Sequence, residues 1–303
     1  MSPNDTSNPL LEAWTTPHET PPFAAIRPEH FRPAVDRAMA DHIAEIEAIA
    51  TCPDAPSFAN TIVALERSGA ALDRVAYVFY ALAGAHTNDA LMAIERKMTP
   101  LFAAHRNRIY LHDGLYARIK ALVDRRGALG LTPEKARVLE RYDVTFRRAG
   151  AGLPAETKNR VAAVSERLAA LGTTFSQNVL ADEQTWALML DGEEDLAGLS
   201  EGARAAASAA AAERDEPGRH AITLARSSVE PFLRSSARRD LREKAYEAWA
   251  ARGNGGGATD NNAIIAETIA LRAERARLRA GDHTRSSSAC TASGVLAIRS
   301  SRR

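Results

Sequence analysis

Hydrophobic residues along most of this chain recur every three or four positions, the spacing of a helix with one buried face. The first such helix is expected to begin at Pro28, because proline is favoured at the first helical position. Its apolar stripe comprises Val35, Met39, Ile43, Ile46 and Ile49. A second stripe runs without interruption from Phe58 to Leu82, and a further long helix is expected from near Pro154 through Phe175. The pattern therefore predicts a protein built mainly from long helices.

Helix starts are indicated by side chains that can accept a hydrogen bond from the first backbone N–H groups. The expected caps are Ser57, Asn88 or Asp89, Thr132 followed by Pro133, Ser236 and Asp260. The tripeptide "HDG" at 112–114 marks a break or kink between two helices.

The hydrophobic period changes between residues 185 and 225. The segments "TWALML" and "RHAITLA" favour strands, and they flank an alanine-rich helix, "EGARAAASAAAAER". The fold class is therefore mainly α, with a small antiparallel strand pair near 185–225.

Three regions follow from these patterns. Residues 1–27 form a proline-rich, extended arm, which we expect Trp14, Phe23 and Ile26 to anchor. Residues 28–279 form a helical lobe. Residues 280–303 lose the pattern, and their serine- and arginine-rich composition is typical of a disordered tail.

Composition and charge narrow the possible partners. With 45% hydrophobic and 25% charged residues, the chain is typical of a soluble globular protein. Residues 277–303 hold six arginines and one aspartate, and subtracting that +5 from the net charge of +1 leaves −4 for the rest. This acidic body gives no electrostatic footprint for nucleic acid, and no apolar run is long enough to span a membrane. Two distant cysteines and the lack of a signal peptide indicate a cytoplasmic protein.

Histidines offer no metal site in this sequence. "HETPP", beginning at His18, has the first two letters of the His-Glu-x-x-His zinc motif but lacks the second histidine, and its prolines prevent a helix. His105 and His112 could share a helix face, but two turns separate them, and a packing or surface role is expected for both. His42 is expected at the edge of the core.

Other catalytic patterns are also missing. There is no G-x-S-x-G, P-loop or G-x-G-x-x-G motif, and "GNGGG" at 253–257 is interpreted as a loop that ends a helix. The carboxylates Glu45 and Glu47, like those at 193–195, are expected on the solvated surface. Cys52 has no basic neighbour in sequence that would activate its thiol. We therefore predict no catalytic, cofactor-binding or metal-binding residue in this chain.

Several long stretches, in order, resemble the start of the M3 zinc oligopeptidases, of the bacterial peptidyl-dipeptidase and oligopeptidase A type. They include "PPFAAIRPEHFRPAVDRAMADHIAEIEAIA", "SFANTIVALERSGAALDRVAYVFYALAGAHTND", "LAALGTTFSQNVL", "RRDLREKAYEAWAARG" and "DNNAIIAETIALRAERA". The resemblance covers roughly residues 8–278. It implies a helical protein of two lobes flanking a channel, which cleaves short peptides with a zinc ion held by His-Glu-x-x-His and a further glutamate.

The sequence departs from the family after about residue 278, where "RLRAGDHTRSSSACTASG" replaces the expected continuation of the helix. We interpret the tail as truncated or out of frame, whether in the gene or through a sequencing error. No position matches a zinc ligand, so zinc belongs to the intact family and to no residue here.

Three functions remain open. The chain is an N-terminal peptidase fragment that is inactive alone, or one half of a peptidase completed by a separate C-terminal catalytic fragment, or a non-catalytic helical binding or scaffold protein. Short peptides are the substrates that the resemblance implies. It leaves the choice between dipeptide release and internal cleavage open, together with peptide specificity and oligomeric state.

Overall fold

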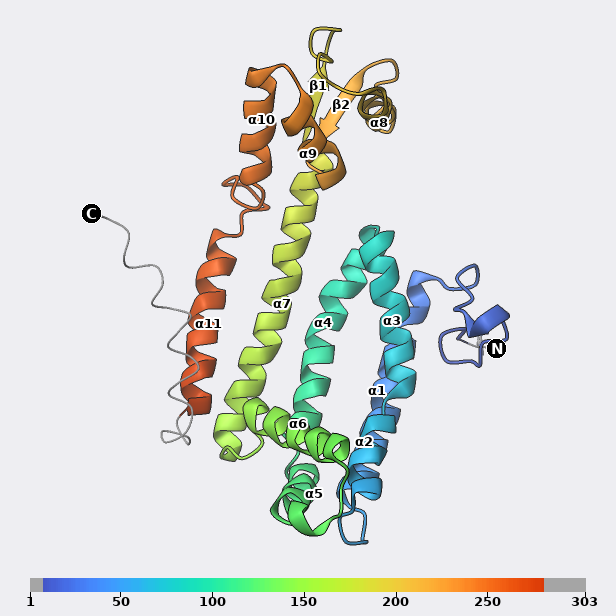
Figure 1. Cartoon of the computed structure of the whole chain (residues 1–303), viewed down its shortest axis with the longest axis vertical. Helices are drawn as coiled ribbons and strands as arrows, with labels where there is room; N and C mark the ends of the chain where they lie inside the picture. Colours follow the sequence, from blue (N-terminus) through green and yellow to red (C-terminus); the bar gives the residue numbers. More distant parts are fainter. Residues whose placement is uncertain (1–7, 281–303) are drawn as a thin grey trace, which may run out of the picture. The chain divides into compact units, whose positions relative to one another are not determined.

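The structure is a computed structural model that describes residues 8–280, and it is mainly α-helical as predicted (Figure 1). The described residues divide into two compact units. The first unit contains the residues up to Ala170 together with those from Ala270 onward, and the second contains Leu171–Ile269. Both boundaries between the units fall inside the range 28–279 that the sequence presents as one lobe. The predicted tail lies outside the described residues, apart from Ala280.

Three helices form the first core of the first unit: α1 (Pro28–Ala50), α3 (Ala70–Ala85) and α4 (Asp89–Tyr110). Their apolar faces meet because each helix carries hydrophobic residues three or four positions apart. The buried cluster comprises Leu10, Ile26, Phe31, Ala34, Val35, Ala38, Leu72, Val75, Val78, Phe79, Leu91 and Met98. Phe31 and Phe79 pack edge to face, with ring centroids 5.1 Å apart.

The N-terminal arm is anchored to this core, but not entirely by the expected residues. Leu10 and Ile26 are buried, and Trp14 packs beside the core under the guanidinium of Arg74, 4.9 Å from the ring centroid. Phe23 is 49% exposed, so the prediction that it anchors the arm was wrong. The arm forms a short 3₁₀ helix, η1 (Pro17–Glu19), and then turns just after Pro21 and Pro22. Phe23 lies in this turn, and its ring is exposed to solvent.

The apolar stripe from Phe58 to Leu82 faces the core as predicted, but several helical segments carry it in place of one uninterrupted helix. It begins as a π-helical turn η2 (Phe58–Val63), continues as α2 (Ala64–Arg67), and stops at Ser68 before α3 begins. Gly69 separates the two helices with a left-handed φ of 77°. Glycine adopts this conformation without steric cost, so the helix is interrupted here while the hydrophobic spacing continues.

A second core lies under α5 (Asp113–Asp124) and α6 (Pro133–Ala149), which are joined through a short 3₁₀ turn η3 (Arg126–Ala128). This core comprises Ile43, Ile46, Ile49, Ile62, Leu65, Ile109, Leu115, Ile119, Leu122, Leu139, Phe146 and Ala151. The break expected at "HDG" is confirmed, because α4 ends just before it and α5 begins within it.

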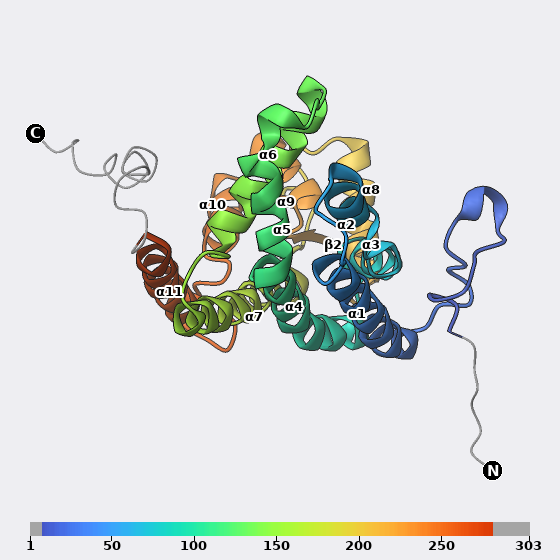
Figure 2. The same cartoon turned by 90° about the horizontal axis from the view of Figure 1, so that it is seen from below.

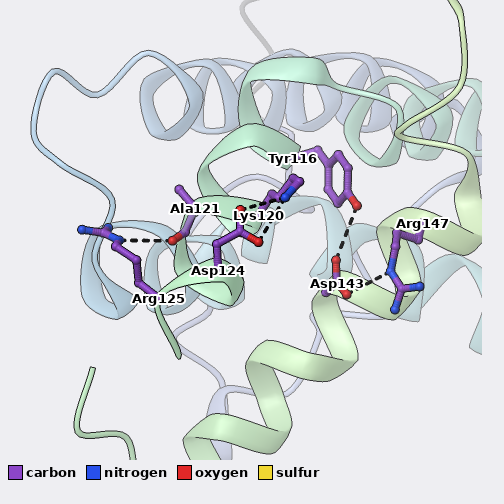
Figure 3. Close-up of polar contacts among 7 residues, drawn as sticks. All are labelled: Tyr116, Lys120, Ala121, Asp124, Arg125, Asp143 and Arg147. Carbon is purple, nitrogen blue, oxygen red and sulfur yellow. Dashed lines mark hydrogen bonds and ion pairs between the residues drawn. The ribbon is translucent and has the colours of Figure 1, made fainter. Parts of the chain in front are cut away.

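A polar contact also joins α5 to α6. The Tyr116 hydroxyl donates to Asp143 at 3.4 Å, and Asp143 accepts from the Nε of Arg147 at 2.9 Å (Figure 3). Burial and the neighbouring Asp143 carboxylate raise the pKa of Tyr116. The tyrosine therefore stays protonated at neutral pH and keeps its donor.

Two long helices pass from one unit into the other: α7 (Ala155–Thr185) and α11 (Asn262–Ala280). Within the first unit, the start of α7 lies between α4 and the end of α11 (Figures 1 and 2). Arg160 of α7 forms a two-pronged ion pair with Glu274 of α11, at 2.5 and 2.8 Å. On the other side, the side-chain amide of Asn107 donates to the carbonyl of Ala162 at 3.2 Å.

The second unit contains the predicted strand pair. Strands β1 (Ala187–Leu190) and β2 (His220–Thr223) are antiparallel, and Ala187 lies opposite Thr223. The alanine-rich helix α8 (Glu201–Ala212) packs on β2. The core of this unit comprises Leu190, Leu196, Leu199, Ala207, Ile222, Val229, Phe232, Leu241 and Ala245.

The sequence did not predict α9 (Arg226–Ser235), which packs on β2 ahead of α10 (Arg239–Ala250). It also assigned the wrong cap to α10. Ser236 closes α9, since its N–H donates to Phe232, and the N-cap of α10 is Arg238. The intervening Ala237 donates its N–H to the Ala197 carbonyl at 2.8 Å, which holds the chain extended and delays the start of the helix.

Three of the remaining predicted caps are confirmed, whereas Asp260 lies one residue before the cap of α11, Asn261. The side chains of Ser57, Asn88 and Thr132 accept N–H groups of the first turn at 3.1, 2.9 and 3.3 Å. Asp260 accepts the N–H of Asn262, the first residue of α11, at 2.8 Å. None of the helices in the described part of the chain has both the length and the apolarity to cross a membrane.

Candidate functional site

Two histidines from different helices meet beside the first break in the helical pattern. The rings of His42 on α1 and His105 on α4 have centroids 4.9 Å apart, and Nδ1 of His42 lies 3.0 Å from Nε2 of His105. The sequence suggests a shared helix face for His105 and His112 and does not reveal the pair of His42 and His105. Only the packing of α1 on α4 brings the two rings together, since 63 positions separate them.

A serine completes the cluster. The hydroxyl of Ser68 lies 3.3 Å from Nε2 of His42 and donates to the carbonyl of Leu65 at 2.8 Å. The next residue, Gly69, donates its N–H to the Glu45 carboxylate at 2.7 Å. A side chain at position 69 would place its Cβ 2.5 Å from the imidazole of His42.

The direction of the hydrogen bonds determines what this cluster can do. The only proton of the Ser68 hydroxyl points to a backbone carbonyl, so the network assigns the proton between these two side chains to Nε2 of His42. Nδ1 of His42 then accepts from Nε2–H of His105. A nucleophilic serine needs the opposite arrangement, in which histidine accepts the hydroxyl proton. The cluster therefore fixes the turn at Ser68 and does not form a hydrolase site.

Both histidines are neutral at pH 7. Burial lowers the pKa of His42, against the opposing influence of Glu45 and Asp73. Burial, followed by the charges of His42 and Arg108, lowers the pKa of His105 to about 4.

The other histidine of interest, His112, has a separate structural role. Its Nδ1 accepts the N–H of Leu115 at 3.1 Å and so caps α5, while its Nε2 lies 3.3 Å from the Glu47 carboxylate. Glu47 and Glu45 therefore do more than face solvent, because each ties a turn to α1. Both carboxylates lie at the surface as predicted, with Glu45 exposed and the Glu47 side chain 47% exposed. The sequence does not show which turns fold back onto α1 to meet them.

The described residues do not fit the zinc ion of the M3 family. His18 lies in the 3₁₀ turn η1 with a left-handed φ of 58°, and a helical His-Glu-x-x-His pair is impossible there. Within residues 8–280, no three side chains of histidine, cysteine, aspartate or glutamate lie together as metal ligands would. We derive no step through zinc from these residues, and the prediction that this chain holds no zinc ligand stays a prediction.

The glycine-rich loop at 253–257 is held by the protein's own carboxylates. The N–H of Gly253 donates to Asp182 at 2.7 Å, and the N–H of Gly256 donates to Asp260 at 3.0 Å. Thr259 also donates to Asp182, at 2.6 Å. A phosphate would compete with two carboxylates here, so this segment is the helix-ending loop that the sequence predicts.

Comparison with known proteins identifies the relatives of the chain. No family model matches it. The dipeptidyl carboxypeptidase of Salmonella typhimurium is 37% identical over 272 residues, covering 90% of this chain and 40% of that protein. The dipeptidyl carboxypeptidase of Escherichia coli is 37% identical over 278 residues, and oligopeptidase A of Salmonella typhimurium is 31% identical over 276.

The chain is a homologue of these M3 peptidases. The resemblance seen in the sequence is thereby confirmed, and the similarity covers nine-tenths of the chain. The chain spans about 40% of the length of the peptidases that it matches.

Proposed function

We propose that this chain is the helical N-terminal part of a zinc-dependent oligopeptidase of the M3 family, acting on short peptides in the cytoplasm. The observation that carries the proposal is the 37% identity to dipeptidyl carboxypeptidases over 272 residues, nine-tenths of the chain. The helical fold with its small strand pair agrees with the architecture that the family resemblance implies. The two cysteines, Cys52 and Cys290, are far apart in sequence, which supports a reducing compartment.

We further propose that the 303 residues alone do not hydrolyse peptides. In zinc peptidases the metal polarises the scissile carbonyl and activates a water molecule, and a glutamate takes the proton of that water. The printed sequence contains no His-Glu-x-x-His motif to supply these groups. Its part in the reaction is then to shape the space into which peptides enter.

An assay of the purified chain tests this proposal. We expect no release of dipeptides from an N-terminally blocked oligopeptide, with or without added Zn²⁺, above the rate with Zn²⁺ alone. The matched positive control is intact dipeptidyl carboxypeptidase at equal concentration. Cleavage by the chain that a chelator abolishes and Zn²⁺ restores would contradict the proposal.

The partner that this proposal implies is a complementing C-terminal catalytic fragment. Two exposed isoleucines on α11 support it: Ile265 and Ile269 lie one helical turn apart and are 43% and 62% exposed. Apolar residues at this spacing on an open helix face are typical of a surface that another segment covers.

Co-expression tests the partner. The chain would be produced together with the part of the Escherichia coli dipeptidyl carboxypeptidase that lies beyond the matched region. We expect chelator-sensitive peptidase activity from the pair and none from either part alone, with Ile269→Glu reducing it at least tenfold. Arg272→Glu, on an exposed position of the same helix, is the control for added charge. Activity that Ile269→Glu leaves unchanged would exclude this docking surface.

A further inference from the structure

Four arginines of the first unit surround one hollow. It has a volume of about 590 Å³ and lies between α4, α6, α7 and α11. The four residues, which we call the arginine hollow, are Arg106, Arg148, Arg275 and Arg279. They come from three helices that are distant in sequence, so only the folded unit assembles them.

These arginines have no carboxylate partner in the described part of the chain. No aspartate or glutamate lines the hollow, and none of the four guanidiniums forms an ion pair with a described residue. Nearby arginines behave differently: Arg147 on α6 pairs with Asp143, and Arg160 on α7 pairs with Glu274 on α11. The Nε of Arg279 is buried and has no hydrogen-bond partner among residues 8–280.

Contacts within the first unit hold Arg106 and the helix that carries Arg275 in place. Arg106 lies over the ring of Tyr110, 5.3 Å from its centroid, and Tyr110 packs on Phe146. The ion pair between Arg160 and Glu274 holds α11 beside α7 one residue before Arg275. Burial, followed by the charges of Arg275 and Arg106, lowers the pKa of Arg279. The like charges therefore repel one another, and a bound anion would relieve that repulsion.

Neutral groups of the lining offer few donors to a ligand. The hydroxyls of Thr99 and Ser165 donate to carbonyls of their own helices, at 2.9 and 2.8 Å. The amide of Asn107 donates to Ala162. Besides the hydroxyls of Thr145 and Tyr110, the side-chain donors that the lining offers a ligand are guanidiniums. Their planar, two-pronged donors match the oxygens of phosphate groups.

We propose that the arginine hollow binds a small polyphosphate, whose phosphate groups are held by guanidiniums from α4, α6 and α11. One orthophosphate would fill only a small part of a hollow of this volume. A chain of two or three phosphate groups brings the several negative charges that four arginines require, either free or as part of a nucleotide.

Titration calorimetry of the full chain with sodium tripolyphosphate at physiological salt tests this proposal. We expect one binding site, and we expect Arg148→Gln and Arg275→Gln each to weaken the affinity about tenfold. Arg141→Gln is the matched control on α6, since Arg141 is exposed and does not line the hollow. It should leave the affinity within twofold of the parent. Circular dichroism of each variant checks that the fold is retained.

The sequence also contains arginines beyond residue 280, so a second variant separates the two sources of charge. It replaces Arg285, Arg299, Arg302 and Arg303 with glutamine in the full chain. Binding that survives this change and is lost in Arg148→Gln/Arg275→Gln supports the hollow. Binding lost with the tail arginines, or equally weakened by Arg141→Gln, overturns the proposal.

Two further ligands identify the chemistry. ATP binding as tightly as tripolyphosphate, or more tightly, supports recognition of the phosphate chain, and a tighter affinity adds a contribution from the nucleoside. A hexaglutamate peptide that binds more tightly than tripolyphosphate would overturn the phosphate assignment in favour of an acidic peptide. No binding of any polyphosphate would overturn the proposal altogether.

Discussion

At the scale of single residues, the turn at Ser68 and Gly69 is fixed by side chains from two helices, α1 and α4. His105 donates to His42, His42 donates to Ser68, and Glu45 accepts the N–H of Gly69. Each contact depends on an atom that a conservative substitution would remove. The backbone conformation of Gly69 and the titration of His105 each lead to a prediction about stability.

Gly69→Ala is expected to destabilise the protein by at least about 2 kcal/mol. The alanine would have to adopt a left-handed backbone conformation, and its Cβ would lie 2.5 Å from the His42 ring. Urea unfolding followed by circular dichroism measures the free energy of unfolding. Gly84→Ala is the matched control in the next helix, where a Cβ meets no atom within 4 Å, and it should stabilise by about 0.5 kcal/mol. Equal effects of the two substitutions would contradict this account.

Stability should fall as the pH is lowered from about 6.5 towards 4. The unfolded chain binds a proton on His105 near the ordinary histidine pKa of 6.5, whereas the folded protein does so only near 4. Between these values the unfolded state binds more protons, so acid favours unfolding. The effect is of the order of 1 kcal/mol, discounted because the ring is partly exposed.

His105→Gln separates the contribution of His105 to the pH dependence of stability from that of the carboxylates, which also titrate in this range. The free energy of unfolding, determined by urea at pH 7 and pH 5, should depend less on pH in the variant than in the parent chain. The same pH dependence in both proteins would show that His105 does not titrate as described.

At the scale of elements, the loop between α1 and η2 is held by one buried arginine. Arg118 of α5 is 7% exposed. Its guanidinium donates to the carbonyls of Cys52 and Asp54 at 2.8 and 3.2 Å, and to the side chain of Asn60 at 3.1 Å. The loop depends on a helix that lies some 60 residues further along the chain.

Arg118→Met should destabilise the protein by about 2–3 kcal/mol, because the two carbonyls lose a buried donor. Lys120→Ala on the same helix is the control: Lys120 and Asp124 form an exposed pair one turn apart (Figure 3). Such a pair contributes less than about 0.5 kcal/mol. Thermal unfolding measures the stability of both variants. A loss of stability for Lys120→Ala as large as for Arg118→Met would contradict the proposed role of Arg118 in holding the loop.

At the scale of the whole molecule, the described residues have two sets of buried cores. Two clusters belong to the first unit and one belongs to the second. Cores that share few side chains can unfold in separate steps. We therefore expect a helical circular dichroism spectrum with a broad thermal transition of low cooperativity, and a single sharp transition would contradict this expectation.

Asn261→Ala should act on the second unit alone. Asn261 is 1% exposed, donates to the Phe175 carbonyl and accepts from the amide of Asn178. Its loss is expected to cost about 2 kcal/mol there. Hydrogen exchange read by mass spectrometry should accelerate in β1 and β2 and stay unchanged in α1. Asn254→Ala, at an exposed position of the same loop, is the control, and uniform acceleration over both units would contradict the division.

The sequence by itself determined the helices, most of their caps, the strand pair and the resemblance to known peptidases. These features depend on local spacing, on side chains that reach backbone groups three residues away, and on long segments shared with relatives. It failed where a local pattern was continuous but the backbone was not, as at Gly69, and where a short helix such as α9 carried no distinctive cap.

Only the tertiary structure decided which polar side chains meet. Three sets of contacts join residues more than 40 positions apart: the pair of His42 and His105, the hydrogen bonds of Arg118, and the arginine hollow. No spacing along the chain encodes such meetings, because they depend on how α1, α4, α5 and α11 pack. The sequence therefore identified the relatives and the helices, and the packing of the helices determined which charges and rings lie together.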